Sequence, residues 1–295
     1  RRRANALEVA THLDAAGQQS NAFPQYLQAA KVAARAGDTA TVLEVTQRMS
    51  DMGNAPRTGV PTQEAARRQR WLYQLRGEAW MARGEWDEAI PALVEAEHWA
   101  REEQDDAAIS RALGARGRAY YRSSDFTSAE PLLRQSLDFG SADTSNRAAV
   151  LRAIADIRLR YGELEESEQL WETALNSAID NHSSDDEARA RRGLAHLRCI
   201  QGRLDDCGHL LDRAEELLDP GGDDHVRASV LARSIEIENC AGRDDAALRR
   251  CETLVDLARR RELATRFSEA YALLAECLWS MGAADDAYDA AHQAH

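Results

Sequence analysis

The sequence predicts an all-α fold, a right-handed α-solenoid built from antiparallel helix pairs. Three observations lead to this prediction. Glycine recurs at a nearly fixed interval, small and large residues keep constant distances from it, and the composition favours helices along the whole chain. One unit of about 40 residues cannot bury its own apolar face, so successive units are expected to stack and share a continuous core.

Turns between the two helices of each pair are predicted at Gly37, Gly84, Ser124, Gly162, Gly202, Gly242 and Gly282. From the second position onward the intervals are 40, 38, 40, 40 and 40 residues. The first interval is 47 residues, and its excess falls in the Pro- and Gly-bearing stretch 51–62. Glycine can adopt positive φ and end the first helix of a pair. We therefore expect about seven helix pairs after one lone helix, with first helices of roughly 16–19 residues in the central pairs.

Other residues keep fixed distances from each turn. A small residue lies seven positions before the turn and an aromatic residue four positions before it. After the turn come an aromatic residue at the second position, alanine at the fifth, leucine at the ninth and a small residue at the twelfth. Around the turns at 84 and 124 these residues are Gly77, Trp80, Trp86, Ala89, Leu93, Ala96 and Gly117, Tyr120, Phe126, Ala129, Leu133, Ser136. This pattern resembles the tetratricopeptide repeat (TPR), in the long variety of about 40 residues found in kinesin light chains and bacterial signal-sensing ATPase regulators.

The resemblance covers residues 23–294 and is weaker outside the two units at 69–138. The alanine five after the turn becomes Ser167 and Cys207 in two later units, and the small residue seven before it becomes Ile235 in another. Ala89 and Ala129 are expected where the two helices of their pairs approach most closely. Residues 1–295 are read as a single solenoid that starts and stops inside repeat units, so we expect a fragment of a larger protein.

Composition and motifs restrict the classes of function that we expect of this chain. The net charge is −13, and no apolar run approaches the roughly 20 residues of a membrane span. Five cysteines form an odd set without a CxxC pair, which favours reduced thiols and a cytoplasmic protein. No HExxH, Walker or dinucleotide-binding motif is present, and the acidic turns lack calcium-ligand spacing. We therefore expect no enzymatic activity, no metal and no cofactor, and nucleic acid is an unfavoured partner.

Charge alternates between the two helices of the central units. Stretch 111–122 holds four arginines and no acid, whereas stretch 163–176 holds five glutamates and no base. The resemblance implies that first helices line a concave groove, with its face thirteen, ten, six, three and two residues before each turn. The predicted peptide-binding groove consists of Arg111, Arg118, Tyr121, Arg122, Arg152, Arg160, Arg189, Arg192 and His196.

Two interpretations of these arginines stay open. They could bind the carboxylates of a ligand, because guanidinium forms bidentate pairs with carboxylate and a groove concentrates the attracting field. They could instead pair with glutamates of neighbouring helices. The first favours a protein–protein interaction scaffold that holds an acidic or carboxylate-ending peptide. The alternative function is a ligand- or partner-sensing region of a larger signalling or transcription-regulating ATPase or kinase. Trp71 and Trp279 are the candidate aromatic anchors.

Overall fold

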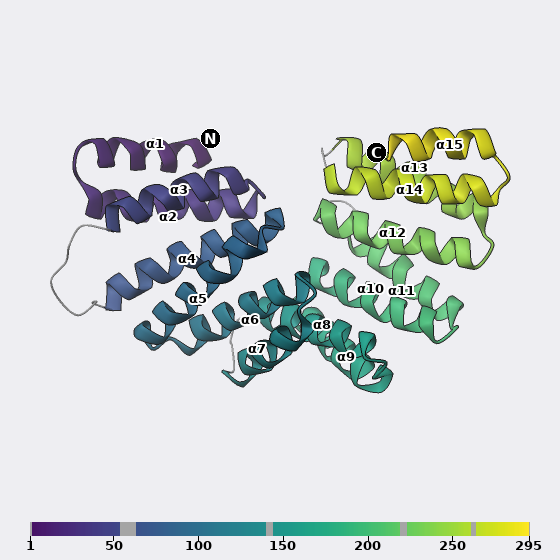
Figure 1. The fold of residues 1–295 in the computed structure, drawn as a ribbon, viewed down its shortest axis with the longest axis horizontal. Coiled ribbons are helices and arrows are strands. Elements are labelled where there is room, and N and C mark those ends of the chain that lie inside the picture. The colour runs from purple at the N-terminus through teal and green to yellow at the C-terminus, as the bar shows by residue number, and fades with distance from the viewer. Residues whose placement is uncertain (1, 54–62, 140–143, 219–222, 261–263, 295) are drawn as a thin grey trace. The chain divides into compact units, whose positions relative to one another are not determined.

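The computed structural model describes residues 2–53, 63–139, 144–218, 223–260 and 264–294 (Figure 1). These ranges hold fifteen α-helices and no strand, which confirms the predicted all-α helical repeat fold. The chain divides into two compact units, unit 1 from Arg1 to Ala153 and unit 2 from Ile154 to His295. That residues 1–295 form a single solenoid stays a prediction, and each unit is described by itself.

Unit 1 begins with one lone helix and continues with helix pairs. Its helices are α1 (Arg2–Ala15), α2 (Gln19–Arg35), α3 (Thr39–Gly53), α4 (Gln63–Arg83), α5 (Trp86–Glu103), α6 (Asp106–Arg122), α7 (Phe126–Asp138) and the greater part of α8 (Thr144–Arg160). The even-numbered members are the first helices of their pairs. Contacts join α2 to α4 and α4 to α6, so the first helices of unit 1 lie beside one another.

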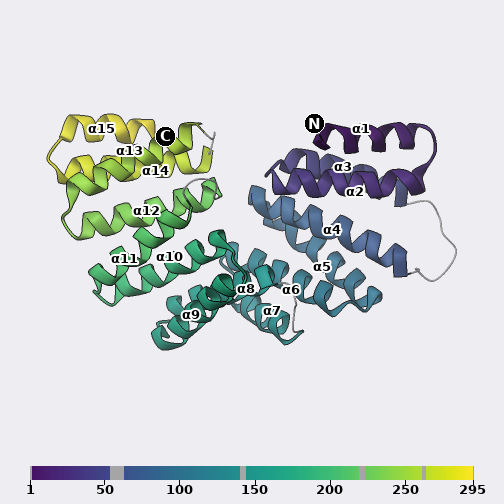
Figure 2. The same ribbon diagram turned by 180° about the vertical axis from the view of Figure 1, so that it is seen from behind.

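Unit 2 repeats the arrangement. After the end of α8 it contains α9 (Leu164–Asp180), α10 (Ser184–Ile200), α11 (Leu204–Leu217), α12 (Asp224–Cys240), α13 (Asp244–Arg260), α14 (Ala264–Ser280) and α15 (Ala284–Gln293). Its first helices α10, α12 and α14 also contact one another in sequence. The second helices α11, α13 and α15 pack against their own first helices α10, α12 and α14, as the view from behind shows (Figure 2). Helices α6, α8, α10 and α12 all have 17 residues, within the expected length.

Every predicted turn position has positive φ. The glycines at 37, 84, 162, 202, 242 and 282 have φ between 67° and 80°, and Ser124 has φ 67° although it carries a side chain. At each turn the next residue donates its backbone N–H to a carbonyl five positions back, for example Glu163 N to Arg158 O at 3.0 Å. This is the hydrogen bond of a Schellman motif, which satisfies a carbonyl at the helix end.

The small residues mark the closest helix contacts, as expected. Ala89 and Ala129 are fully buried. A Cβ added to Gly77 would lie 2.6 Å from Leu93 Cγ, and one added to Gly117 would lie 2.7 Å from Leu133 Cγ. Glycine seven before the turn therefore makes room for leucine nine after it.

In later units other residues fill the contact between the two helices of a pair. Ser167 Oγ donates to Ala155 O at 2.9 Å, and Cys207 Sγ contacts Ala195 O at 3.0 Å. Both side chains are fully buried and occupy the alanine position, so a hydrogen bond to the first helix compensates for their polar atoms. The exceptional Ile235 shares a core cluster with Cys251, which stands nine after its turn in place of leucine. The larger residue on one helix is thus matched by a smaller one on the other.

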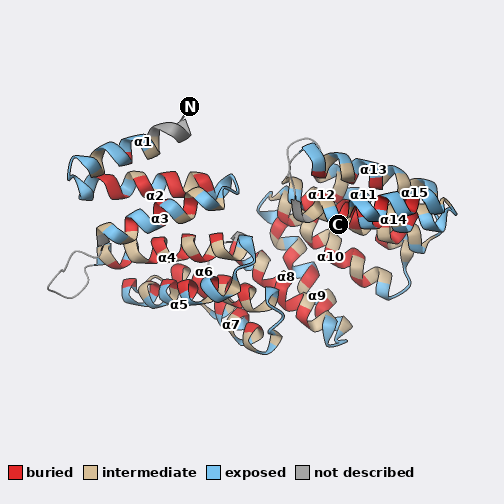
Figure 3. Ribbon diagram, turned by 45° about the horizontal axis from the view of Figure 1, so that its top comes forward, coloured by how far each residue is buried: buried red, intermediate tan, exposed pale blue. Residues whose placement is uncertain are grey.

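Buried residues lie between neighbouring helices, while exposed residues cover the outer surfaces (Figure 3). Unit 1 also buries polar groups. Glu103 at the end of α5 is 2 % exposed and binds Arg70 Nε at 2.6 Å and Arg67 Nε at 2.7 Å. Asn146 at the start of α8 contacts Ser110 on α6 and Ser136 on α7. These contacts tie successive helix pairs of unit 1 together through buried hydrogen bonds.

Candidate functional site

The predicted groove residues all lie on first helices, and the unit boundary separates them. Arg111, Arg118, Tyr121 and Arg122 on α6 belong to unit 1, together with Arg152 on α8. Arg160, at the end of α8, belongs to unit 2 with Arg189, Arg192 and His196 on α10. The groove as one continuous site therefore stays a prediction, and its two parts are described separately.

In unit 1 two predicted arginines are held by neighbouring first helices. The Arg111 guanidinium lies 5.6 Å from the ring centroid of Trp71 on α4. Arg118 Nη1 donates to Asn146 Oδ1 on α8 at 2.9 Å. Both side chains are half-buried. Contacts with an aromatic ring and a buried amide help to fix the positions of these two guanidinium groups.

The other predicted residues of unit 1 differ in exposure. The Tyr121 ring packs against Phe126, with ring centroids 6.0 Å apart. Arg122 is exposed in the last turn of α6, and Arg152 is half-buried on α8. Arg122 at the carboxyl end of α6 also interacts favourably with the helix dipole.

In unit 2 Arg189 forms two ion pairs, one of which joins neighbouring helices. Its Nη2 lies 2.9 Å from Asp223 Oδ2, directly before α12, and its Nη1 lies 3.5 Å from Asp186 Oδ1. The first of these ion pairs links α10 to the start of the next first helix. For this residue the structure favours the interpretation of an ion pair with neighbouring helices.

A second group in unit 2 is predominantly cationic, and we call Arg160, Arg192, His196 and Arg233 the His196 cluster. Its members come from α8, α10 and α12, and Arg192 and His196 lie one helical turn apart. Burial lowers the pKa of His196 to about 4, and the charges of Arg233, Arg192 and Arg160 act in the same direction. The imidazole is therefore neutral at physiological pH, and the local field disfavours additional positive charge.

Acidic side chains on α12 and α14 lie near the His196 cluster. Arg233 Nη1 pairs with Glu236 on the same helix. Burial raises the pKa of Glu236; the Arg233 charge opposes this rise, whereas the charges of Glu269 and Glu276 on α14 add to it. First-helix charge in unit 2 thus changes from basic on α10 to acidic on α14, as the sequence indicates.

Several arginines outside the predicted groove face form ion pairs between helices. Arg116 on α6 binds Glu97 on α5 at 2.6 Å, and Arg198 on α10 binds Glu168 on α9. Arg250 on α13 contacts acids on α11 and α12 at 3.1–3.2 Å. The opposite charges of first and second helices therefore serve in part to form ion pairs between helices. Ligand binding by the predicted groove arginines stays a prediction.

Sequence reasoning missed two cationic residues. Lys31 lies six before the turn at Gly37, a groove position, so the same spacing applied to the first pair would have found it. Arg233 lies nine before Gly242 and has no such signal. Of the two aromatic candidates, Trp279 is 71 % exposed on α14. The other, Trp71, is contacted by Lys31 Nζ at 3.7 Å from its centroid.

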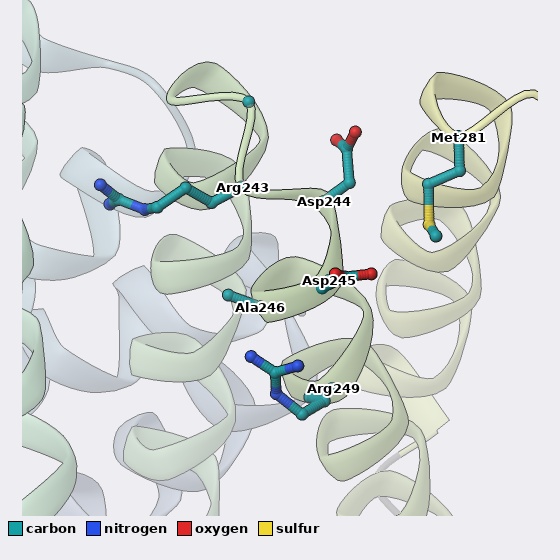
Figure 4. Close-up of a pocket in the computed structure, with 7 residues that line it drawn as sticks. Arg243, Asp244, Asp245, Ala246, Arg249 and Met281 are labelled. Carbon is teal, nitrogen blue, oxygen red and sulfur yellow. The ribbon is translucent and has the colours of Figure 1, made fainter.

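A surface depression at the start of α13 is lined by Arg243, Asp244, Asp245, Ala246, Arg249 and Met281, with Met281 facing the first turn of that helix (Figure 4). The Asp244 carboxylate accepts a hydrogen bond from Ser280 at 3.1 Å. Burial raises the pKa of the Cys207 and Cys251 thiols to about 12, which makes both poor nucleophiles.

Within the part of the chain that the structure describes, no group of three or more His, Cys, Asp or Glu side chains is placed to hold a metal ion. Among the helices so described, none has the length and apolar character required to cross a membrane.

No protein-family model matches the chain, and no curated protein matches it. Solved structures do resemble it. NprR in complex with its cognate peptide NprX matches with a TM-score of 0.67 and 14% identity, over 92% of this chain and 76% of that one. A Rap protein complexed with competence and sporulation factor matches with a TM-score of 0.64 and 14% identity, over 93% and 91%.

A third structure is a signal transduction ATPase with numerous domains and a tetratricopeptide repeat sensor, from Pyrococcus horikoshii. It matches with a TM-score of 0.63 and 14% identity, over 93% of this chain but only 42% of that one. Identities this low establish the fold alone. With the helix pairs, the Schellman turns and the small-residue contacts, they show that this chain has a TPR-type helical repeat fold.

Proposed function

We propose that this chain is a peptide-binding scaffold whose first-helix faces take an acidic or carboxylate-ending segment of a partner. The observation that carries the proposal is the His196 cluster, in which the charges of arginines from three first helices act on one half-buried imidazole. Guanidinium groups recognise carboxylates through paired, charge-assisted hydrogen bonds. NprR and the Rap protein support the proposal, because each has a similar fold and is named in complex with a peptide or factor.

His196 provides a direct readout of binding. A bound carboxylate would offset the arginine charges around the imidazole, so the His196 pKa should rise from about 4 towards its ordinary value. NMR titration of the His196 resonance, with pairs of acidic peptides ending in a free carboxylate or an amide, measures this rise. The free-acid peptides should bind more tightly, and their affinity should fall as salt screens the charges.

Charge reversal separates the first-helix face from the rest of the surface. Arg192→Glu should weaken peptide binding by at least about tenfold, because a charge-assisted contact is replaced by repulsion. Arg213→Glu is the matched control, since Arg213 is exposed on α11 and pairs only with Glu216 among the described residues. Circular dichroism confirms that both variants fold. Equal affinities of the two folded variants would show that peptides bind elsewhere.

In unit 1 the same comparison applies to Arg118 and Arg152. We predict that Arg152→Glu reduces capture of an acidic peptide far more than Arg213→Glu does. A loss confined to Arg192→Glu would restrict the peptide site to unit 2.

A second candidate function is the sensing of a ligand or partner within a larger signalling protein. The Pyrococcus horikoshii ATPase favours it, because that protein has a tetratricopeptide repeat sensor and this chain spans 42% of its length. The complete open reading frame tests this alternative. A nucleotide-binding or DNA-binding domain fused to the repeats would support a sensor, whereas repeats alone would support a scaffold.

A further inference from the structure

A cavity of about 590 Å³ lies along α2, which contacts both α1 and α3 (Figure 1). We call it the α2 cavity, and its lining includes Leu7, Glu8, Ala29, Val32, Ala33 and Asp38. The apolar members are buried or half-buried, whereas the two acids are exposed, so the cavity opens to solvent at a carboxylate-bearing rim. Its volume lies within the roughly 300–1,000 Å³ of typical ligand sites.

The sequence explains why the molecule is hollow at α2. In the next two pairs, the first helices carry arginine eight residues before the turn and an aromatic residue four before it, namely Arg76, Trp80, Arg116 and Tyr120. At the same positions α2 carries Ala29 and Ala33. None of the other predicted turns is preceded by alanine at both positions. Two large side chains are thus replaced by two methyl groups.

Contacts in the later pairs show what this replacement removes. Arg76 Nη2 donates to Gln47 Oε1 on α3 at 3.3 Å, and Arg116 Nη1 binds Glu97 on α5 at 2.6 Å. In both cases the arginine reaches the helix that precedes its own. The helix that precedes α2 is α1, and alanine cannot make this contact. Glu8 on α1 has no cationic partner among the described residues.

The second carboxylate at the rim is that of Asp38, directly after the turn glycine. Its oxygens accept hydrogen bonds from the Thr41 hydroxyl at 2.7 Å and the Thr41 backbone N–H at 3.0 Å. These two hydrogen bonds lower the pKa of Asp38, so the carboxylate is ionised at neutral pH. Each oxygen has a second lone pair, so Asp38 can accept a further hydrogen bond while it caps α3.

The cations of α2 do not neutralise this rim. Lys31 Nζ lies 3.7 Å from the ring centroid of Trp71 on α4. The charge of Arg35 acts on Lys31, whose pKa it helps to lower. In the described ranges, neither cation forms an ion pair with Asp38 or Glu8. The α2 cavity therefore combines an apolar interior with negative charge at its opening.

We infer that the α2 cavity binds a small apolar molecule that carries one amino group. The apolar part takes the space that arginine and an aromatic ring fill in the later pairs, and its burial favours binding. Both carboxylates line the same cavity, so they attract an ammonium group without any need for it to bridge them, and they repel an anion. The site shares no residue with the His196 cluster or the predicted groove and goes beyond the peptide-binding function proposed above.

Three probes of one shape test the preference for charge: 4-phenylbutylamine, 4-phenylbutan-1-ol and 4-phenylbutyrate. Methyl NMR of protein labelled at Leu, Val and Ala observes Leu7, Val32 and Ala33 directly. We expect saturable shifts of these signals with the amine, which should bind at least about tenfold more tightly than the carboxylate, with the alcohol between them. Added salt should reduce this difference. No saturable shift with the amine, or equal affinity for amine and carboxylate, would overturn the inference.

Variants locate the site. Ala33→Trp supplies the aromatic residue that α4 has at this position and should abolish amine binding, because the ring fills the cavity. Asp38→Asn should weaken amine binding by about fivefold or more and leave alcohol binding unchanged. Asparagine caps helices as well as aspartate does, so this variant is expected to fold even if Ala33→Trp does not.

The matched control is Asp125→Asn. Asp125 caps α7 by accepting a hydrogen bond from Ser128 N at 3.0 Å, as Asp38 does at α3, but its pair has Arg116 and Tyr120 in place of the two alanines. This variant should bind the amine like the parent. Unchanged amine binding by both Ala33→Trp and Asp38→Asn would refute the assignment.

A second copy of this chain is the competing occupant of the cavity. Analytical ultracentrifugation of the parent and of Ala33→Trp tests it. A parent dimer that the variant abolishes would assign the cavity to a contact between copies and overturn the inference, whereas a monomer that binds the amine supports it. Arg192→Glu should weaken acidic-peptide binding yet keep the response to 4-phenylbutylamine, and Asp38→Asn should do the reverse. Failure of the proposed function and failure of this inference are therefore separable.

Discussion

Units 1 and 2 are built from the same helix pair but stabilise it by different contacts. Unit 1 places glycine opposite leucine and buries a charged group, Glu103, between two arginines. In two pairs of unit 2 the corresponding positions hold Ala155 and Ala195, whose carbonyls are contacted by Ser167 and Cys207. The same helix pair can thus be packed in several ways, provided that volumes match and the polar atoms buried at these contacts find partners.

The exposed first-helix faces differ as well. In unit 1 the cations Lys31, Arg70 and Arg111 gather around an aromatic ring. In unit 2 arginines around His196 give way to glutamates on α14. In unit 1 an aromatic ring thus helps to position the cations, whereas in unit 2 Arg233 pairs with the carboxylate of Glu236.

The buried charge should give the largest effect. Glu103→Ala leaves Arg70 buried without its main counter-ion and should lower the free energy of unfolding by about 3–5 kcal/mol. Chemical denaturation measures the change. In unit 2, Glu216→Ala removes an exposed pair with Arg213 and should cost about 0–1 kcal/mol. Similar losses in the two variants would mean that Glu103 is not a buried ion-pair partner.

The second-largest loss of stability is expected from overpacking the contact between two paired helices. Ala89→Leu forces extra volume into the closest contact of α4 and α5 and should cost about 1–3 kcal/mol, measured by thermal unfolding. The comparison in unit 2 is Ser167→Ala, which adds no volume and removes one hydrogen bond, at about 1 kcal/mol. A melting temperature of Ala89→Leu equal to that of the parent would contradict the packing described for this pair.

Acid should destabilise unit 2 through His196. Its folded pKa of about 4 lies below the ordinary value of 6.5, so between these pH values the unfolded chain binds a proton that the folded chain does not. Stability should therefore fall as pH drops from 6.5 to 4, by about 1 kcal/mol after solvent screening of the half-exposed ring. Glu236 and other groups titrate in both proteins, so His196→Gln isolates this contribution. An identical pH dependence in parent and variant would exclude it.

The turn at Ser124 should give the smallest effect. The backbone of Ser124 adopts the left-handed conformation that glycine adopts at the other predicted turns. Ser124→Gly removes this strain but increases the freedom of the unfolded chain, so a net gain of about 0.5 kcal/mol is expected. Gly162→Ser in unit 2 is the reverse change and should be destabilising by a similar amount. A loss on Ser124→Gly would show that the serine contributes a stabilising contact.

The sequence by itself determined the helix pairs and their turns, because both depend on local chemistry. Positive φ favours glycine at a helix end, and the spacing of Gly77, Ala89 and Leu93 records which residues face each other in one pair. The predicted groove residues also lie on first helices, at the distances before each turn that the resemblance to the TPR family implies.

Only the tertiary structure decided which charges meet. Arg189 and Arg118 have similar phase, yet one pairs with Asp223 and the other with Asn146, each 28 or more residues away. The convergence of Lys31 and Arg111 on Trp71 joins three helix pairs, and the burial of Glu103 joins two. Such contacts depend on how successive units stack, which the periodic pattern does not specify. Electrostatic environment, and with it the choice of ligand, follows from that stacking.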